Sequence, residues 1–413
     1  MSKHTERIGV VVVGGGAAGL VAIMAARNGA KVLILEHNEV PGKKILATGN
    51  GKCNYTNKVQ GVDKYYGQNP VFVAPVFEQF GLEETLQFFK ELGIYPKERN
   101  GGYDPESEQA TAIRDVLLME LKKQNVGVVC GCGIRGIEKT AKGFTFHTKG
   151  GDFYATKCIM ATGGKTLKKS GSDGSGFLYL ESLGHHIIDL VPGLIGLKGK
   201  QSFFADIAGI RADAKVDLYI ESTHVCSERG ELQLTNYGIS GIPVFQLSRV
   251  AARALSEQKK VYATLNFVPF WEKEQCLTYF KERFKKADEK HIGEALIGFF
   301  PEKLIPVLLE ESHIKAAKYA NRLQTEELER FIDTVQGLRV DITDWNTFDT
   351  AQVTAGGVDT DEIDAETMES KLCPGLYFAG EMVDIDGICG GYNLQWAWSS
   401  GAVAGIHVAR ELS

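Results

Sequence analysis

A glycine-rich turn near the start of the chain, Gly14-Gly15-Gly16-Ala17-Ala18-Gly19, constrains the fold more than any other feature. The β-branched run at residues 8–13 predicts a buried strand before the turn, and residues 20–28 predict a helix after it. In such a unit the first glycine allows a tight turn, the second lets the backbone approach a pyrophosphate, and the third lets the helix pack close to the strand.

The acid after the next predicted strand completes this pattern. Residues 31–35 predict a second strand, and Glu36 follows it about 20 residues beyond the glycines, where a carboxylate can accept hydrogen bonds from an adenosine ribose. The free N–H groups and the dipole at a helix start favour phosphate. We therefore predict a dinucleotide site, with a purely structural glycine-rich turn as the alternative. The motif by itself does not separate FAD from NAD.

Length and composition narrow the class of protein. A chain of 413 residues is too long for one ordinary core, so we expect two or three domains. A net charge of −6 gives no basic excess to suggest nucleic acid. The uncharged run at residues 8–26 is long enough to suggest a membrane span, but glycines interrupt it and the strand–turn–helix prediction accounts for it. We expect a cytoplasmic protein with a small-molecule substrate and neither a membrane nor a nucleic-acid partner.

The cysteines and histidines show no metal-ligand spacing. No CxxC pair is present among the 8 cysteines, and the closest two, Cys130 and Cys132, would share one face of a strand and pack there. The adjacent His185 and His186 would point apart. We therefore expect neither a metal site nor disulfide exchange.

The loop after Glu36 is unusually rich in glycine, asparagine and lysine. Residues 41–44 and 47–54 together hold Lys43, Lys44 and Lys52 among three glycines and two asparagines. Such a composition is typical of backbone laid against an anionic or polar ligand, and the lysines could neutralise a pyrophosphate. A solvated surface loop is the alternative.

Further elements follow from periodicity and turn signals. Residues 75–92 predict a helix, and Ser107 is a candidate cap for the next one. Residues 143–148 and 153–160 predict a hairpin that leads into Ala161-Thr162-Gly163-Gly164, another close approach to a ligand.

The pattern of the sequence changes near residue 192. Extended segments at residues 215–220, 230–235 and 261–268 predict a barrel-like β domain, and residues 271–337 are strongly helical, with Thr325 as a predicted cap. Strand-like residues 340–343 lead back, so residues 192–348 predict an insertion. We predict a discontinuous dinucleotide-binding domain at residues 1–191 and 349–413, a barrel at 192–270 and 338–348, and a helical domain at 271–337.

The last 65 residues contain three more glycine-rich segments. Residues 354–358 predict a turn, residues 375–381 predict a buried strand that ends on Gly380 and Glu381, and residues 387–393 predict a loop. A small-residue helix over 394–409 follows, and its first N–H groups would face a ligand.

At these segments the chain resembles the two-dinucleotide-fold flavoproteins, and more narrowly the BaiN/YhiN-like (aminoacetone oxidase) family of FAD-binding enzymes. Four blocks carry this resemblance, at residues 42–54, 230–241, 354–371 and 380–395. The resemblance implies an α/β fold: an FAD-binding Rossmann-like two-dinucleotide-fold domain with an inserted β-barrel and a helical cap. It implies FAD as the cofactor, with NAD(P)H as a transient electron donor.

The resemblance also implies which residues hold the cofactor, from its adenosine end to its flavin ring. The candidates are Gly14, Gly16, Ala17, Ala18, Gly19, Glu36, Lys43, Lys44, Thr48, Gly49, Asn50, Gly51, Cys53, Asn54, Ile134 (through its backbone, to adenine), Ala161, Thr162, Gly163, Gly380, Glu381, Gly391, Asn393, Leu394 and Gln395.

The sequence indicates the catalytic residues less clearly than the cofactor-binding residues. Tyr392 could exchange a proton with a substrate, or its ring could pack on the cofactor. Thr354, Tyr237 and Ser240 are weaker candidates. The family implies an FAD-dependent oxidoreductase, and we favour reduction of an activated C=C bond of the enone type, as in bile-acid intermediates. An amine oxidase that uses O₂ is the alternative, followed by a flavin-binding sensor without turnover and by a plain NAD-dependent dehydrogenase.

Overall fold

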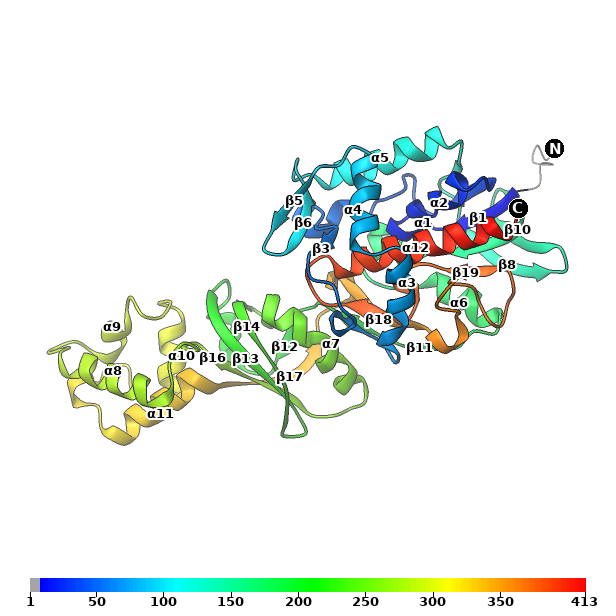
Figure 1. Ribbon diagram of the computed structural model, residues 1–413. Helices are drawn as coiled ribbons and strands as arrows, with labels where there is room; N and C mark the ends of the chain where they lie inside the picture. Colours follow the sequence, from blue (N-terminus) through cyan, green and yellow to red (C-terminus); the bar gives the residue numbers. More distant parts are fainter. Residues whose placement is uncertain (1–7) are drawn as a thin grey trace. The chain divides into compact units, whose positions relative to one another are not determined.

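The computed structural model describes residues 8–413, so the first seven residues of the predicted dinucleotide-binding domain lie outside it. The chain separates into two compact units. The first unit comprises the described residues up to Leu190 together with Phe348–Ser413, and the second unit is Val191–Thr347. Each unit has its own apolar core. Figure 1 shows their elements coloured along the chain.

The first unit is built on a seven-stranded sheet of order β7-β2-β1-β10-β9-β8, with β19 paired to β10. Neighbours from β7 to β10, and β10 with β19, run parallel, whereas β8, β9 and the start of β10 form an antiparallel meander. The strands are β1 (Ile8–Val13), β2 (Val32–Leu35), β7 (Gly127–Val129), β8 (Ile134–Thr140), β9 (Gly143–Thr148), β10 (Gly151–Met160) and β19 (Leu376–Phe378). This parallel α/β core confirms the predicted fold class.

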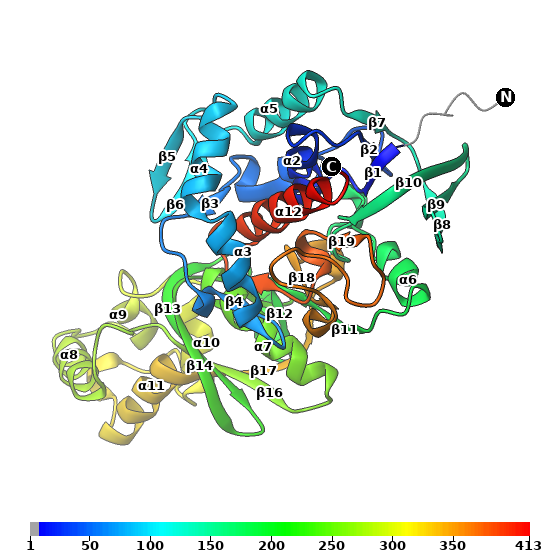
Figure 2. The same cartoon turned by 45° about the vertical axis from the view of Figure 1, so that its right-hand side comes forward.

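The longest helix of the described chain, α12 (Tyr392–Arg410), packs along the helices that follow β1. Figure 1 shows it beside α1 (Ala17–Val21) and α2 (Ile23–Arg27), and Figure 2 shows it again beside α2. A Cβ added to Gly401 would overlap the carbonyl oxygen of Ala18, so the backbones touch where glycine permits it. We predicted one helix over residues 20–28; instead it breaks at Ala22, where Gly405 of α12 approaches the Ala22 carbonyl.

Smaller elements surround this sheet. They are β3 (Thr56–Asn57), β4 (Tyr65–Tyr66), β5 (Pro96–Arg99), β6 (Gly102–Pro105), β11 (Ile187–Gly193), β18 (Val353–Val358), β20 (Asp386–Gly387), α3 (Val73–Gln79), α4 (Leu82–Glu91), α5 (Ala110–Lys123), α6 (Ser175–Ser182), and the 3₁₀ turns η1 (Ile45–Gly51), η2 (Val62–Lys64), η3 (Pro70–Phe72), η4 (Lys168–Ser170), η7 (Phe348–Thr350), η8 (Thr360–Glu362) and η9 (Gly380–Met382).

Three local predictions in the first unit were wrong. The helix predicted over residues 75–92 is two helices, because Gly81 begins α4. Ser107 does not cap α5: Glu108 adopts a left-handed φ of 51°, and the helix begins after Gln109. The predicted turn at residues 354–358 is the buried strand β18, in which Gly356 admits the carbonyl oxygens of Ile188 and Asp189.

The predicted strand face for Cys130 and Cys132 was also wrong. Both residues lie between β7 and β8 rather than on a strand, with Cys130 exposed and Cys132 buried. No helix of residues 8–413 is both long enough and apolar enough to cross a membrane.

The second unit begins with a closed antiparallel barrel of order β12-β15-β14-β13-β16-β17. Its interior is apolar because alternate residues such as Ala214, Val216 and Leu218 face inward along one strand. The elements are β12 (Leu197–Gly199), β13 (Arg211–Ile220), β14 (Thr223–Thr235), β15 (Gly238–Gly241), β16 (Val261–Asn266), β17 (Leu338–Trp345), helix α7 (Ile242–Ser256) and the 3₁₀ turn η5 (Ser202–Ala205).

The rest of the second unit is helical. It contains α8 (Lys273–Lys285), α9 (Ile292–Leu296), α10 (Leu304–Glu311), η6 (Ala320–Arg322) and α11 (Thr325–Gly337). The predicted face of Cys276, Phe280 and Phe284 is buried. The cap of α11 is Gln324 rather than the predicted Thr325, and Glu327 accepts a hydrogen bond from the Gln324 N–H at 2.8 Å.

Candidate functional site

The glycines of the first turn have different structural roles. Gly14 has a φ of +100°, and a Cβ on it would lie 2.5 Å from the Ala161 carbonyl oxygen. A Cβ on Gly19 would overlap the carbonyl oxygen of Gly14. Gly16 is different, because among the described residues no atom lies within 4 Å of an added Cβ. Gly14 and Gly19 thus permit packing, whereas Gly16 leaves open space at the start of α1.

Glu36 lies against this turn. Its Oε2 accepts the Gly15 N–H at 2.6 Å, and its Oε1 accepts the Asn38 N–H at 2.7 Å. The residue is only 6% exposed. The acid predicted to contact the ribose is therefore held in a fixed position beside the glycines.

Two adjacent lysines of the following loop take different positions. Lys43 is exposed. Lys44 instead points to the C-terminal half of the unit, with its Nζ 2.7 Å from Glu381 Oε2 and 3.0 Å from Thr166 Oγ1. Both lysines were predicted to lie at a pyrophosphate. In the structure, Lys43 has its charge in solvent, and Lys44 has a protein partner.

Glu381 is the centre of a polar group that we call the Lys44–Glu381 cluster: Lys44, Thr166, Thr354 and Glu381. Glu381 Oε1 accepts the Thr354 N–H at 2.7 Å and the Thr166 hydroxyl at 3.2 Å. Thr354 is 1% exposed, and its hydroxyl oxygen accepts the Lys165 N–H at 2.7 Å. These contacts make Thr354 a support for Glu381, and its predicted catalytic role stays a prediction.

The loop at residues 48–54 contains several strained backbone positions. Asn50 and Cys53 have φ angles of 53° and 64°, in the left-handed region that few residues other than glycine adopt. Thr48 turns this loop, with its hydroxyl donating to the Ile45 carbonyl at 2.6 Å. Cys53 is completely buried, and this burial raises the pKa of its thiol to about 12. A thiol with such a pKa stays protonated and is not a nucleophile at neutral pH.

Polar atoms in the predicted cofactor segments fit a ligand that would satisfy them. Among the described residues, Asn54 Oδ1 and Thr162 Oγ1 are buried in these segments without a hydrogen-bond partner. Buried polar groups are almost always paired, so unpaired atoms in such segments are notable. Together with the open space at Gly16, they make this part of the first unit suitable for a large polar cofactor.

The start of α12 forms the other half of the site. Gly391 precedes the helix with a φ of +96°, and the first intrahelical bond is from the Gln395 N–H to the Gly391 carbonyl at 3.0 Å. The N–H groups of Tyr392, Asn393 and Leu394 therefore have no acceptor within the helix. Partial positive charge at such a helix start would stabilise negative charge on a reduced flavin.

The loop before α12 is held rigidly by Asn393. The Gly387 N–H donates to Asn393 Oδ1 at 2.8 Å, and Asn393 Nδ2 donates back to the Gly387 carbonyl at 2.7 Å. Gln395 is buried instead, with its Nε2 donating to Thr85 Oγ1 and to Ser399 Oγ, each at 2.8 Å. The Gln395 amide therefore serves the packing of α12, and its contact with the cofactor stays a prediction.

Tyr392 is 5% exposed and packs edge-on against Tyr65, with 6.0 Å between ring centroids. Burial raises the pKa of the Tyr392 phenol above its usual value. The ring packs on Tyr65, and its packing on the cofactor stays a prediction. The raised pKa keeps the hydroxyl protonated and able to donate a proton.

Several supporting residues were missed by sequence reasoning. The Tyr65 hydroxyl donates to the Tyr392 carbonyl at 3.2 Å, and Asn57 Nδ2 donates to the Gly390 carbonyl at 2.9 Å. Thr166 contacts both Lys44 and Glu381. Asn57 lies three residues beyond Asn54, so the run of polar residues there was the signal that could have identified it.

Four further residues were predicted at the site. The Ile134 carbonyl accepts the Tyr179 hydroxyl at 2.6 Å, and its contact with adenine stays a prediction. Ala161 follows β10 and lies beside the glycine turn, with its N–H donating to the Val13 carbonyl at 2.9 Å. Tyr237 and Ser240 belong to the second unit and are not part of the site described here.

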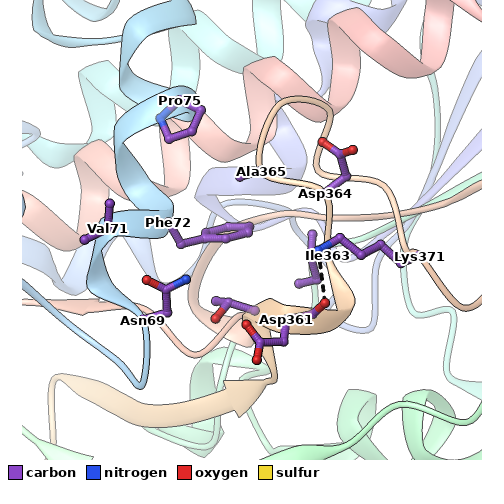
Figure 3. Close-up of a pocket in the computed structure, with 10 residues that line it drawn as sticks. Asn69, Val71, Phe72, Pro75, Asp361, Ile363, Asp364, Ala365 and Lys371 are labelled. Carbon is purple, nitrogen blue, oxygen red and sulfur yellow. Dashed lines mark hydrogen bonds between the residues drawn. The ribbon is translucent and has the colours of Figure 1, made fainter.

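A surface hollow of about 330 Å³ lies elsewhere on the first unit. Figure 3 shows Phe72 and Ile363 within it and the Lys371 ammonium group bound to the Asp361 carbonyl. None of the predicted cofactor or catalytic residues lines this pocket.

A second polar group has the connectivity of a hydrolytic triad. His185 Nδ1 lies 2.8 Å from Glu362 Oε2, and its Nε2 lies 2.9 Å from Ser370 Oγ. Ser370 Oγ also accepts the N–H groups of Leu372 at 3.1 Å and of Cys373 at 2.8 Å, so its lone pairs are occupied. The serine is buried, and the group joins three segments rather than presenting a nucleophile. In residues 8–413 no three His, Cys, Asp or Glu side chains are grouped to hold a metal ion.

Comparison with known proteins gives a consistent result over nearly the whole chain. The model of the family described as "HI0933-like protein Rossmann domain" matches residues 8–407. A "3-dehydro-bile acid delta(4,6)-reductase" of Clostridium scindens is 45% identical over 403 residues, which cover 97% of this chain and 98% of that protein.

More distant matches also span most of the chain. A "Ribosomal RNA dihydrouridine synthase" of Escherichia coli is 29% identical over 396 residues, 96% of each chain. Among solved structures, the open conformation of a flavocytochrome c3 fumarate reductase superposes with a TM-score of 0.50 at 15% identity, covering 98% of this chain and 78% of that one. At this identity the superposition shows a shared fold alone.

Proposed function

The chain belongs to the HI0933-like Rossmann family, and from that premise we propose that it is an FAD-dependent reductase that saturates a C=C bond conjugated to a carbonyl group. The observation that carries this proposal is the full-length match, at 45% identity, to a protein named as a reductase of a 3-dehydro-bile acid. The proposal also rests on the glycine turn and the start of α12, which lie in one compact unit as a split FAD site requires.

The names of two relatives describe similar chemistry on different molecules. A 3-dehydro-bile acid with delta(4,6) unsaturation has C=C bonds conjugated to a ketone. Formation of dihydrouridine saturates the C=C bond of uracil that is conjugated to its carbonyl group. The chemistry common to both names is the reduction of an activated C=C bond, and we assign this reaction class to the chain.

Bound FAD would supply the two-electron chemistry of this reaction. The chain itself must bind the cofactor, orient the substrate and deliver a proton. The turn around Gly16 would receive the phosphates, and the N–H groups of Tyr392, Asn393 and Leu394 would stabilise negative charge at the flavin.

Tyr392 is our candidate for the proton donor. Saturation of a conjugated C=C bond adds a proton to the carbon next to the carbonyl group, so an acid must be available at neutral pH. The raised pKa of Tyr392 keeps its hydroxyl protonated. Its backbone carbonyl is held by the Tyr65 hydroxyl, which would fix the position of the ring.

We propose NAD(P)H as the electron donor. The sequence has one complete dinucleotide fingerprint, which we assign to FAD, so NAD(P)H would have to approach the flavin transiently. The donor and the final acceptor can be tested together by steady-state assays under nitrogen. We expect NADH or NADPH oxidation that depends on a 3-oxo-4-ene or 3-oxo-4,6-diene steroid. A saturated 3-oxo steroid is the matched control and should give none.

A second candidate substrate is uridine within ribosomal RNA, because two relatives carry that name at 29% and 28% identity. The charge of the chain does not favour it: the net charge is −6, and acidic and basic residues nearly balance across residues 191–347. Incubation with unmodified ribosomal RNA and NADPH separates the two substrates, because RNA reduction would produce dihydrouridine that mass spectrometry detects. Peroxide formation from an amine in air, without reduction by NAD(P)H, would instead favour the oxidase.

A further inference from the structure

The glycine turn around Gly16 is joined by a backbone hydrogen bond to the loop that follows Glu36. The Gly42 N–H donates to the Gly15 carbonyl at 2.7 Å, which fixes this loop to the glycine turn. Lys44 lies two residues further along and contacts Glu381. The lysine is thereby positioned by the same turn that we assign to the phosphates.

The C-terminal half of the unit also contacts the start of α1. Gly380 has a φ of +78°, and a Cβ on it would lie 2.8 Å from the Cβ of Ala18 in α1. Glu381 is the next residue. Gly15 and Ala18 lie on either side of Gly16 in the sequence. Gly15 contacts Gly42, and Ala18 contacts Gly380. The Lys44–Glu381 pair joins these two contacts into a closed ring.

This ion pair is the side-chain link in a ring that otherwise consists of backbone and glycine contacts. The two side chains are 22% and 19% exposed, so water screens the pair only in part. Glu381 has further partners in Thr166 and Thr354, which hold its carboxylate when the lysine moves. Lys44 has a flexible stem and is the partner able to swing away.

We propose that the Lys44–Glu381 ion pair is a latch that closes the first unit around FAD and limits how fast the cofactor leaves. The pair acts by position rather than by its net charge, because it joins the loop at residues 42–44 to the segment that begins at Gly380. Lys44 is thus a positioning residue for cofactor retention.

The latch predicts a different result from a direct electrostatic attraction between Lys44 and the phosphates. A direct attraction between Lys44 and the phosphates would make FAD leave faster from Lys44→Gln and more slowly from Glu381→Gln, since the second change removes a negative charge near the phosphates. A latch, in contrast, is lost when either of its two residues is changed. Both variants should therefore release FAD about tenfold faster, since one hydrogen bond between charged groups is lost in each.

The experiment measures FAD release from the holoenzyme by the rise in flavin fluorescence after dilution. The variants are Lys44→Gln, Glu381→Gln, the double variant and Lys44→Arg. The control is Lys58→Gln, which removes an exposed ion pair to Glu98 in the same unit. We expect the double variant to release FAD no faster than either single variant, Lys44→Arg to recover part of the retention, and Lys58→Gln to match the wild type.

The inference rests on the proposed FAD dependence, and the two can fail separately. Wild-type protein without bound FAD would overturn the proposed function. Wild-type protein that holds FAD while Lys44→Gln and Glu381→Gln release it at the wild-type rate would overturn the latch alone. Slower release from Glu381→Gln, or additive effects in the double variant, would also overturn it. Glu381→Gln preserves the shape of the side chain, so it tests the latch even where Lys44→Gln fails to fold.

Discussion

The two units of this chain are assembled differently, although each has its own apolar core. The second unit is one continuous segment with a conventional apolar core, in which barrel residues such as Leu265 and helix residues such as Phe280 and Phe331 are fully buried. The first unit is assembled from both ends of the chain, and these ends meet where Gly401 of α12 lies against the backbone of Ala18 in α1, a contact that a Cβ on Gly401 would block. The first unit also leaves an open space at Gly16, as expected of a turn that receives the phosphates of a ligand.

The largest expected effect comes from the glycines of the first unit. Gly19→Ala would place a Cβ on the Gly14 carbonyl, so we expect a loss of about 4 kcal/mol or more of unfolding free energy together with loss of bound flavin. Gly16→Ala is the matched control, because no described atom lies within 4 Å of its new Cβ. It should keep the wild-type melting temperature while FAD affinity falls. Unchanged FAD affinity in Gly16→Ala would remove the phosphate role of this turn.

A change in the second unit should separate stability from cofactor binding. Phe280→Ala removes a fully buried ring, so we expect a loss of about 3–5 kcal/mol. At temperatures where the variant is still folded, its flavin absorption spectrum and FAD content should equal those of the wild type. Calorimetry and flavin absorbance on one sample test this. A folded Phe280→Ala protein that lacks flavin would contradict the distinction between the two units.

Tyr392→Phe should affect chemistry with little effect on the fold. Removing the proposed proton donor is expected to lower the turnover number by about 100-fold, and FAD content should be unchanged. Because burial raises the Tyr392 pKa above 10.0, the acid form persists through neutral pH. The wild-type rate should therefore fall only as pH rises through that elevated pKa. A rate in Tyr392→Phe within twofold of the wild type would exclude the tyrosine.

The smallest effect is expected at Cys53. Its thiol has a pKa near 12 and no cysteine partner in a CxxC pair, so it should carry no redox step. Cys53→Ala is expected to cost about 1 kcal/mol of stability through a small cavity and to leave flavin reduction unchanged. Alkylation of the native protein by iodoacetamide should modify the exposed Cys130 and spare Cys53. Loss of flavin reduction in Cys53→Ala would show that the first unit uses its thiol.

Much of the first unit could be predicted because its signals are local. The strand β1, the glycine turn and Glu36 lie within about 30 residues, and their backbone requirements restrict the amino acids that fit. The barrel was predicted from its recurring extended segments, and α12 from its small residues. These features depend on neighbours in the sequence or on a fixed period.

The parts that escaped prediction depend on contacts between distant segments. Lys44 and Glu381 are 337 residues apart, so no local pattern could assign one as the partner of the other. The same holds for the break at Ala22, which lies against Gly405, and for β18, whose glycines suggested a turn. The small residues of α12 indicated close packing correctly, but the sequence did not show which segment would approach them.

The central claim is that the first unit holds FAD and uses it to pass electrons from NAD(P)H to a conjugated C=C bond. The most direct test is an anaerobic absorbance titration of the purified protein, first with NADH or NADPH and then with a 3-oxo-4,6-diene steroid. We expect a flavin spectrum that the nicotinamide bleaches and that the steroid restores in the absence of oxygen. A colourless protein, or a reduced flavin that only oxygen restores, would contradict the claim.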